Sequence, residues 1–289
     1  MRVAIQGERG SFSHEAAVEF FPALDELVPC AVSPEVFSLL ASSRVDAAVV
    51  PIENSLAGSV LEHYDLLLEH PVHIVAERLL RIRHQLIAAP GTRLKEVREV
   101  YSHPVALAQC RRFFLEHPEV RALPFYDTAG SAAQAVRLGG AVAGVASSLA
   151  AEECRGQILA ADIEDNAANY TRFLLLRPFG APPVVGTPGL DTAAGGAEGP
   201  NKVSLAFSVP NRAGSLVEAL QIFAHHRLNL TRLESRPVPG SPWEYVFYAD
   251  YALGSESAAD QAMQQLKALC GFVKELGRYA AARPLDVSQ

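Results

Sequence analysis

The chain is short of basic residues and of long apolar runs. It has 289 residues, with 25 Lys and Arg against 32 Asp and Glu, which gives a net charge of −7. Because no basic stripe is present to neutralise phosphates, the sequence argues against nucleic acid as the main partner. No apolar run approaches the roughly 18 residues that a membrane-spanning helix requires, so we expect no membrane partner. An anionic ligand would need local groups to attract it against the overall charge.

Features of secreted and metal-binding proteins are missing too. The start of the chain lacks the basic segment, apolar stretch and cleavage site of a signal peptide, so we expect a cytoplasmic protein. His63, His70 and His73 lack the HExxH pattern and a nearby partner set, so we expect no metal site. We expect reduced core thiols, because no CxxC pair occurs among the four cysteines, Cys30, Cys110, Cys154 and Cys270.

Residues 1–178 alternate strand-like and helix-like segments. This pattern is typical of an α/β fold with mostly parallel strands. Polar, cap-forming turns follow the predicted strands that end at Gln6, Val50, Tyr101, Phe125 and Ala146. The chain leaves one lobe, builds a second and returns, which predicts a two-lobed domain around a cleft, similar to periplasmic binding proteins. Functional residues of such sheets lie beyond the carboxyl ends of the strands.

A polar loop with the sequence GERGSFS, residues 7–13, joins the first strand to a helix that Ser11 or Ser13 would cap. A helix N-terminus after a glycine-bearing turn is a common anion site, because free N–H groups and the helix dipole point at the ligand. The spacing fits neither the P-loop nor the dinucleotide fingerprint, so we do not expect a nucleotide. A plain turn between strand and helix explains the loop equally well.

Two further stretches carry polar side chains at strand ends. Glu53, Asn54 and Ser55 follow a strand and offer a possible acid or base with two orienting groups, although Asn54 or Ser55 could simply cap a helix beside an exposed Glu53. At residues 169–173 (NYTRF), Thr171 and Arg172 stand at the mouth of a strand that continues through an apolar run. A hydroxyl and a guanidinium there could hold and protonate an anion. On spacing alone, a strand that begins with a good β-former and a surface Arg explains them as well.

The second half of the chain has a different composition. Residues 179–200 are rich in Gly, Pro and Ala, which predicts a linker. Residues 201–280 then show the order βαββαβ, the ferredoxin-like split βαβ arrangement, followed by a tail at 281–289. This domain has no obvious catalytic set, which is typical of a regulatory or assembly module.

Together these stretches resemble the prephenate dehydratase family with a C-terminal ACT domain, over nearly the whole chain. The resemblance rests on five motifs in order: GERGSFSHEA at 7–16, VPIENSLAGSV at 50–60, SHPVALAQC at 102–110, DTA at 127–129 and NYTRF at 169–173. Two motifs in the C-terminal part are similar to the family's phenylalanine-site motifs: Gly214, Ser215, Leu216 and Val217, then Glu234, Ser235, Arg236 and Pro237. Seven matches in the right order make a chance resemblance improbable.

The resemblance implies a reaction. Prephenate loses carbon dioxide and its ring hydroxyl to give phenylpyruvate, a step of phenylalanine biosynthesis that uses no metal or organic cofactor. Hydroxide is a poor leaving group and needs a proton, and a positioned acid contributes roughly 10²–10⁴-fold. The family implies that Thr171 has the key role, as a hydrogen-bond donor or the last donor in a relay, with Glu53 and Asn54 as its catalytic partners.

The resemblance also implies the binding residues. We expect Arg172 to pair with a substrate carboxylate, which Arg can do in a bidentate way. The other expected substrate-site residues are Ser11, Ser13, Ser55, Ser102, Gln109 and Phe173, the last also part of the core. The eight residues of the two C-terminal motifs would bind phenylalanine between subunits, which implies a homodimer or a dimer of dimers. Ser215 stands where the family commonly has Ala, and the domain could instead serve only for dimerisation.

Two alternatives stay open from the sequence. An arogenate dehydratase would act on the amino analogue of prephenate, and few contacts distinguish the two substrates. A non-catalytic small-molecule sensor would also have two lobes and an ACT domain. The set of Glu53, Asn54 and Thr171 favours an enzyme, because a pure binding protein has no need of it.

Overall fold

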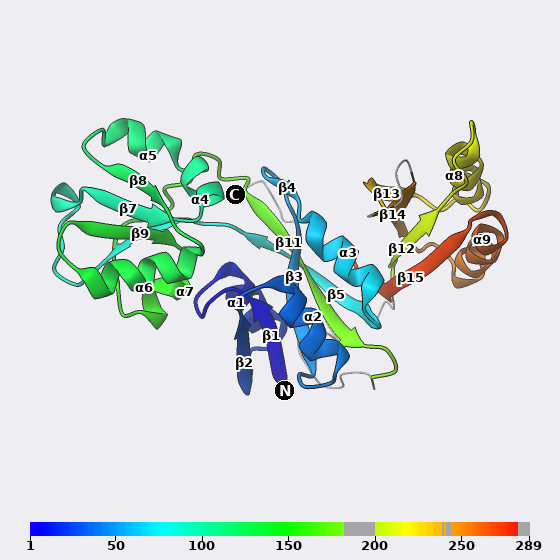
Figure 1. Cartoon of the computed structure of the whole chain (residues 1–289), viewed down its shortest axis with the longest axis horizontal. Helices are drawn as coiled ribbons and strands as arrows, with labels where there is room; N and C mark the ends of the chain where they lie inside the picture. The colour runs from blue at the N-terminus through cyan, green and yellow to red at the C-terminus, as the bar shows by residue number, and fades with distance from the viewer. Residues whose placement is uncertain (182–199, 239, 241–243, 283–289) are drawn as a thin grey trace.

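The computed structural model describes residues 1–181, 200–238, 240 and 244–282, and Figure 1 shows three parts in a row. The first lobe lies in the middle, a second lobe lies to its left, and a C-terminal domain lies on the right. The predicted two-lobed α/β domain and ferredoxin-like domain are confirmed. Most of the predicted linker at 179–200 and of the tail at 281–289 lies outside the described residues. No described helix is long and apolar enough to span a membrane.

The first lobe is one mixed sheet covered by helices. Its strand order is β2-β1-β3-β11-β5, with the short β4 paired to β3. Strand β1 is parallel to β2 and β3, but β11 is antiparallel to both its neighbours because the chain returns from the second lobe. The elements are β1 (Arg2–Gln6), α1 (Phe12–Phe20), β2 (Glu26–Cys30), α2 (Ser33–Ala41), β3 (Ala47–Asn54), β4 (Gly58–Ser59), α3 (Leu61–Glu69), β5 (Val72–Arg81) and β11 (Tyr170–Pro178).

The second lobe has a sheet of order β10-β6-β9-β7-β8. Gly144 of β9 allows helix α6 to approach closely, because a Cβ there would lie 2.7 Å from the backbone nitrogen of Ala132. The elements are β6 (Gln85–Ala88), the 3₁₀ turn η1 (Leu94–Glu96), β7 (Glu99–Ser102), α4 (Pro104–Ala108), α5 (Arg111–Glu116), β8 (Arg121–Pro124), α6 (Thr128–Leu138), β9 (Val142–Ala146), α7 (Ser148–Glu153) and β10 (Gln157–Ala160).

Two crossover segments, residues 82–84 and 161–169, connect the lobes and lie side by side. The backbone N–H of Ile82 donates to the carbonyl of Asn169 at 2.8 Å, and that of Ile163 donates to the carbonyl of His84 at 2.9 Å. The two lobes are therefore joined by one hydrogen-bonded pair of segments.

The C-terminal domain is an antiparallel sheet of order β13-β14-β12-β15 with both helices on its outer face (Figure 1). Its elements are β12 (Lys202–Ser208), α8 (Ser215–His225), β13 (Leu230–Pro237), β14 (Tyr245–Ala252), α9 (Glu256–Leu269) and β15 (Phe272–Tyr279). Alternation of apolar residues along β12 places Val203, Leu205 and Phe207 in the core beneath the helices.

The other face of this sheet packs on the first lobe. Tyr248 and Leu276 belong to the same buried apolar cluster as residues of α2 and α3. Lys274 donates through Nζ to the carbonyls of Leu67, Leu68 and His70, which satisfies the free carbonyls at the end of α3. The domain therefore shares a core with the first lobe.

Candidate active site

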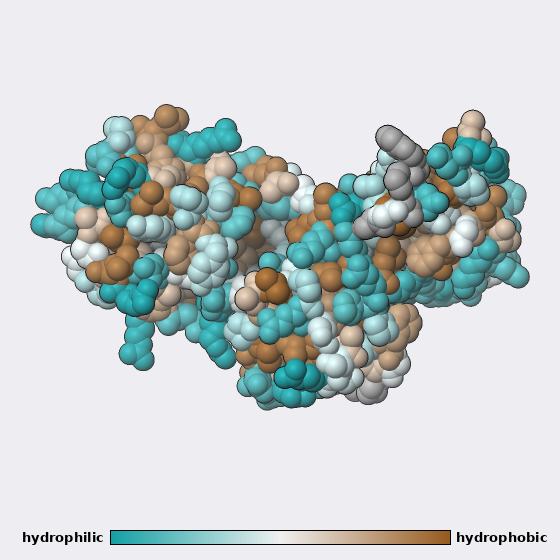
Figure 2. All heavy atoms as spheres, in the orientation of Figure 1, coloured by the Kyte–Doolittle hydropathy of each residue, from teal (hydrophilic) through white to brown (hydrophobic). Residues whose placement is uncertain are grey.

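A cavity of about 480 Å³ lies between the two lobes, where Figure 2 shows the surface hollowed. Within the described part of the chain, none of the residues that line it is Lys or Arg. The first residues of α1 and α6 line it instead, including Ser11, Ser13 and Thr128. An anion in the cavity would therefore meet hydroxyls and the partial positive charge of helix N-termini.

Strand alternation decides which predicted residues face this cavity. Thr171 and Phe173 of β11 line it, whereas Arg172 between them points to the other face of the sheet. Thr171 stands opposite Asn54 in the ladder with β3, and Arg172 stands opposite Glu53. Thr171 and Asn54 are thus brought together at the cavity, while Glu53 and Arg172 are brought together behind it.

The side chain of Asn54 fixes the hydroxyl of Thr171. Asn54 Oδ1 accepts hydrogen bonds from the backbone N–H groups of Leu56 at 3.0 Å and Ala57 at 2.8 Å, so its other atom must be the NH₂ group. That Nδ2 donates to Thr171 Oγ1 at 2.9 Å. Since Oγ1 accepts there, the proton of Thr171 is free to be donated elsewhere, and no other described residue takes it.

Gln109 also reaches the cavity. It caps the C-terminus of α4. Its Oε1 accepts from Asn169 and His84, both at 2.9 Å. Its NH₂ group makes no hydrogen bond with another described residue and remains available to a ligand.

Besides Arg172, two predicted substrate-site serines do not line the cavity. Ser102 is completely buried and donates through Oγ to the carbonyl of Val145 at 2.6 Å, which ties β7 to β9. Ser55 donates to the carbonyl of Ala168 at 3.1 Å and accepts from the backbone N–H of Tyr170 at 3.0 Å. Both hydroxyls support the frame of the site, because their hydrogen bonds go to backbone groups of neighbouring segments.

Comparison with known proteins identifies the family. The family model for prephenate dehydratase matches residues 3–179, and that for the ACT domain matches residues 203–271. The chain belongs to the prephenate dehydratase family. Arogenate dehydratase 2 of Petunia hybrida is 40% identical, across 96% of this chain and 71% of that protein. A bifunctional chorismate mutase/prephenate dehydratase of Aquifex aeolicus is 35% identical, across 98% of this chain and 74% of that protein.

Solved structures agree with the fold. Prephenate dehydratase of Arthrobacter aurescens in complex with L-Phe has a TM-score of 0.84 and 30% identity, across 97% of this chain and 90% of that one. A structure described as a novel type of quorum-quenching acylase also has a TM-score of 0.84, with 31% identity across 98% of both chains. The fold of this family is therefore shared by proteins that are described with different activities.

Further residues line the cavity for which the sequence predicted no role: His103 and Asp127 of the second lobe and His84 of a crossover segment. His103 caps α4, and Asp127 caps α6 by accepting from the N–H of Gly130 at 2.7 Å. Burial raises the pKa of Asp127 above its ordinary value. His84 lies beside Gln109, and burial lowers its pKa. The DTA and SHP motifs contain Asp127 and His103, whereas His84 lies in no motif.

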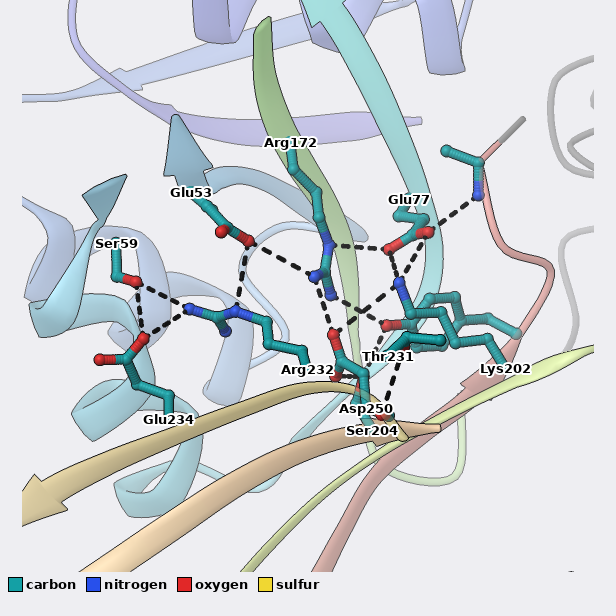
Figure 3. A network of polar contacts seen from close by, with 12 residues as sticks. Glu53, Ser59, Glu77, Arg172, Lys202, Ser204, Thr231, Arg232, Glu234 and Asp250 are labelled. Carbon is teal, nitrogen blue, oxygen red and sulfur yellow. Dashed lines mark hydrogen bonds and ion pairs between the residues drawn. The ribbon is translucent and has the colours of Figure 1, made fainter. Parts of the chain in front are cut away.

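The predicted catalytic Glu53 and carboxylate partner Arg172 face the ACT domain instead (Figure 3). Arg172 Nε lies 2.8 Å from Glu77 of β5, and its Nη1 lies 2.8 Å from Asp250 of β14. Glu53 lies 3.2 Å from Nε of Arg232 in β13 and 3.8 Å from Arg172. The buried guanidinium of Arg172 is already paired with carboxylates of this same chain. The structure therefore does not place Arg172 where it could bind a substrate in the cavity.

The charges of this cluster compensate one another. Burial alone would raise the pKa of Asp250, but Arg172 and Lys202 hold it below its ordinary value. Lys202 Nζ also contacts both carboxylate oxygens of Glu77 at 3.0 Å. A buried charge that lost its partner would be costly, so the cluster stabilises the contact between β11 and the ACT domain only as a complete set.

The two predicted effector motifs lie apart within one chain. The first, Gly214 to Val217, lines a pocket of about 200 Å³ together with Tyr245 and Phe247. In the second, Glu234 accepts from Ser59 Oγ at 3.0 Å, and Arg236 pairs with Asp65 of α3. Its other two members, Ser235 and Pro237, are exposed on the edge strand β13. A single chain therefore does not assemble both motifs into one pocket.

Proposed function

We propose that the chain is a prephenate dehydratase that converts prephenate to phenylpyruvate, carbon dioxide and water with uptake of one proton. The observation that carries the proposal is the hydroxyl of Thr171, held by Asn54 with its proton directed away from its partner, in a cavity between the lobes. A donor in this state can hydrogen-bond the departing ring hydroxyl as the ring aromatises. Membership of the prephenate dehydratase family supports the same reaction.

The lack of Lys and Arg among the described residues that line the cavity suits the loss of carbon dioxide. A carboxylate held only by hydroxyls, an amide and a helix N-terminus is less stabilised than one paired with Arg. The neutral carbon dioxide that forms from it needs no such partner, so its loss is favoured. We assign the carboxylate contacts to Ser11, Ser13, the NH₂ of Gln109 and the N-terminus of α1, with Phe173 below the ring. Ser55, Ser102, Glu53 and Arg172 have supporting contacts instead.

Glu53 is poorly placed to resupply the proton of Thr171. It lies on the opposite face of β3, and the group that contacts Thr171 is the amide of Asn54, which does not relay protons at neutral pH. Asp127 and His103 are titratable groups that line the cavity itself. The proton taken up in the reaction therefore enters from the cavity side, from solvent or from these two groups.

The test is turnover of prephenate by the purified chain, with phenylpyruvate followed by absorbance. Arogenate, run in parallel with phenylalanine as the measured product, tests the second candidate, which the 40% identical arogenate dehydratase favours. The substrate with the larger kcat/KM is assigned as the natural one. Absence of turnover with both would contradict the proposal. An acyl-transfer activity is disfavoured, because Thr171 has an amide rather than a base beside it.

Regulation by phenylalanine through the ACT domain is the second part of the proposal. A structure of a family member was solved with L-Phe, and the first effector motif lines a pocket in this chain. Because the second motif lies elsewhere on the exposed edge strand β13, we propose that two chains combine to complete the effector site, in a dimer or a dimer of dimers. Calorimetric titration with phenylalanine, alongside sedimentation, tests both claims.

The contact of β13 with the cavity wall could transmit effector binding from the ACT domain to the cavity. Ser59 lines the cavity and contacts both Glu234 and Arg232, at 3.0 and 2.7 Å. An effector that moves β13 would move Ser59 and Glu53 with it, provided that it prefers one of the two arrangements. Arg232→Gln should bind phenylalanine with unchanged affinity and be inhibited several-fold less. Unchanged inhibition would remove this route.

A further inference from the structure

The amide of Asn54 is one member of a longer chain of side-chain hydrogen bonds. Its Nδ2 donates not only to Thr171 but also to Asn169 Oδ1, at 2.8 Å. Asn169 Nδ2 then donates to Gln109 Oε1 at 2.9 Å, and His84 Nε2 lies 2.9 Å from the same oxygen. Five side chains from distant parts of the sequence thus form a continuous chain that ends at the Thr171 hydroxyl.

The backbone sets the direction of every hydrogen bond in this chain. The N–H groups of Leu56 and Ala57 determine which end of the Asn54 amide is the NH₂ group. Asn169 must therefore present its oxygen to Asn54 and its NH₂ group to Gln109, which in turn must present its oxygen. Gln109 Oε1 accepts from His84 only if the imidazole carries its proton on Nε2. The chain of hydrogen bonds therefore also selects the tautomer of His84.

The chain also connects the two lobes. Asn54 belongs to the first lobe and Gln109 to the second, whereas His84 and Asn169 lie on the two crossover segments between them. Asn169 is completely buried, and His84 is 2% exposed. Because both side chains are buried, their polar groups incur a desolvation cost that the chain of hydrogen bonds offsets.

We propose that Asn169 is a positioning residue that orients the Thr171 hydroxyl through Asn54 and makes this orientation depend on the contact between the lobes through Gln109. Asn169 does not itself line the cavity, so it acts on the reaction only through its neighbours. The inference deepens the proposed dehydratase function and rests on it for its kinetic test. Displacement of the second lobe would break the bond from Asn169 to Gln109 and release the amide that holds Asn54.

The test is the nearly isosteric variant Asn169→Asp. At pH 8 its ionised carboxylate still accepts from Asn54 but cannot donate to Gln109, so we expect kcat for prephenate to fall at least tenfold with KM changed less than threefold. A buried carboxyl that faces an acceptor oxygen is protonated more readily than usual, and the protonated form can donate. The ratio of variant to wild-type kcat should therefore rise as the pH is lowered.

Asn166→Asp is the matched control. It introduces the same charge three residues away, at an exposed residue whose Oδ1 keeps its hydrogen bond from the N–H of Ala168. Its kcat should equal that of the wild type at every pH. If Asn169→Asp behaved like this control, the positioning role would be disproved.

A double-mutant cycle separates positioning from general damage. In a Thr171→Val background there is no hydroxyl to orient, so Asn169→Asp should lower the residual kcat no further. Equal losses of kcat in both backgrounds would overturn the proposal, because general damage would act on both. Thermal unfolding of all four proteins records any loss of stability separately.

A measurement without substrate keeps this inference apart from the proposed function. Nitrogen-15 NMR of the histidines should show His84 as the neutral Nε2–H tautomer in the wild type. The Nδ1–H tautomer would contradict the direction of the chain even in an active enzyme. Conversely, the Nε2–H tautomer in a protein that turns over neither prephenate nor arogenate would contradict the dehydratase function and leave the hydrogen-bond chain supported.

Discussion

The two faces of strands β3 and β11 differ sharply in charge. On the cavity face, Thr171 and Asn54 carry a hydroxyl and an amide, and no Lys or Arg of the described residues lines the cavity. On the opposite face, one residue along each strand, Arg172 and Glu53 join a cluster of charges shared with the ACT domain (Figure 3). The same short stretches therefore carry the proposed chemistry on one side and the domain contact on the other.

This difference teaches how catalysis and regulation can be linked in one fold. Since adjacent residues of a strand cannot move independently, a shift of the ACT domain that pulls on Arg172 also moves Thr171. Under the proposed function, keeping the cations on the domain side would leave the substrate carboxylates weakly stabilised. The predictions below test this division, from the largest expected effect to the smallest.

Removal of the hydroxyl on the cavity face should have the largest effect. Thr171→Val keeps the shape of the side chain but has no donor for the departing oxygen. We expect kcat for prephenate to fall by roughly 10²-fold, within the usual range for acid catalysis. The assay is phenylpyruvate formation, with circular dichroism as the control for folding. Turnover within threefold of the wild type would remove Thr171 from the mechanism.

A substitution on the charged face should have the next largest effect, a loss of unfolding free energy. Arg172→Leu leaves Glu77 and Asp250 without their shared guanidinium, which we expect to cost about 3 kcal/mol of unfolding free energy. KM for prephenate should change less than threefold. The exposed pair of Arg93 and Glu96 provides the control, since Arg93→Leu should leave the unfolding midpoint almost unchanged. A tenfold rise in KM at unchanged stability would instead make Arg172 a substrate ligand.

A smaller effect should appear in the pH dependence of stability. The folded-state pKa of Asp250 lies below its ordinary value, so its pairing stabilises the fold fully above the unfolded-state pKa of about 3.9. That contribution is lost as the pH falls through the lower folded-state pKa. Asp250→Asn should therefore unfold at a lower temperature than the wild type near pH 7, with the difference narrowing below about pH 4. A constant difference would show that Asp250 is not the titrating group.

The smallest effect is expected at Ser215, where the family commonly has Ala. Its hydroxyl donates to the carbonyls of Pro210 and Arg212 and is buried, so it is directed into the turn rather than into the adjoining pocket. Ser215→Ala should change the affinity for phenylalanine less than threefold. Calorimetric titration checks this, and a tenfold change would mean that the hydroxyl contacts the effector.

The sequence predicted the fold, and its motifs include residues that line the cavity, among them Asn54, Thr171 and Gln109. Asn54 ends β3, but Thr171 lies near the start of the antiparallel β11 and Gln109 caps α4. The rule that functional residues lie beyond the carboxyl ends of strands therefore locates only Asn54. It was harder to predict which face of the sheet each side chain occupies. The alternation of side chains nevertheless implied that Thr171 and Arg172 could not both face one cavity. Applying that alternation to the NYTRF stretch would have placed Arg172 on the face of the sheet opposite to Thr171.

Other features had no signal in the sequence. The partners of Arg172 include Asp250, in a different domain, and a pattern of local spacing does not show such pairs. His84 stands in no motif, and its place in the hydrogen-bond chain depends on how the two crossover segments pair. The family resemblance implied that Ser102 is a substrate ligand, yet its buried hydroxyl donates to the carbonyl of Val145.

A crystal structure with phenylpyruvate bound tests the division between the two faces most directly. We predict that the product lies between the lobes, with its carboxylate on the α1 N-terminus or Gln109 and its ring near Thr171, while Arg172 stays on Glu77 and Asp250. A guanidinium of Arg172 that had left these carboxylates to bind the product would contradict the account.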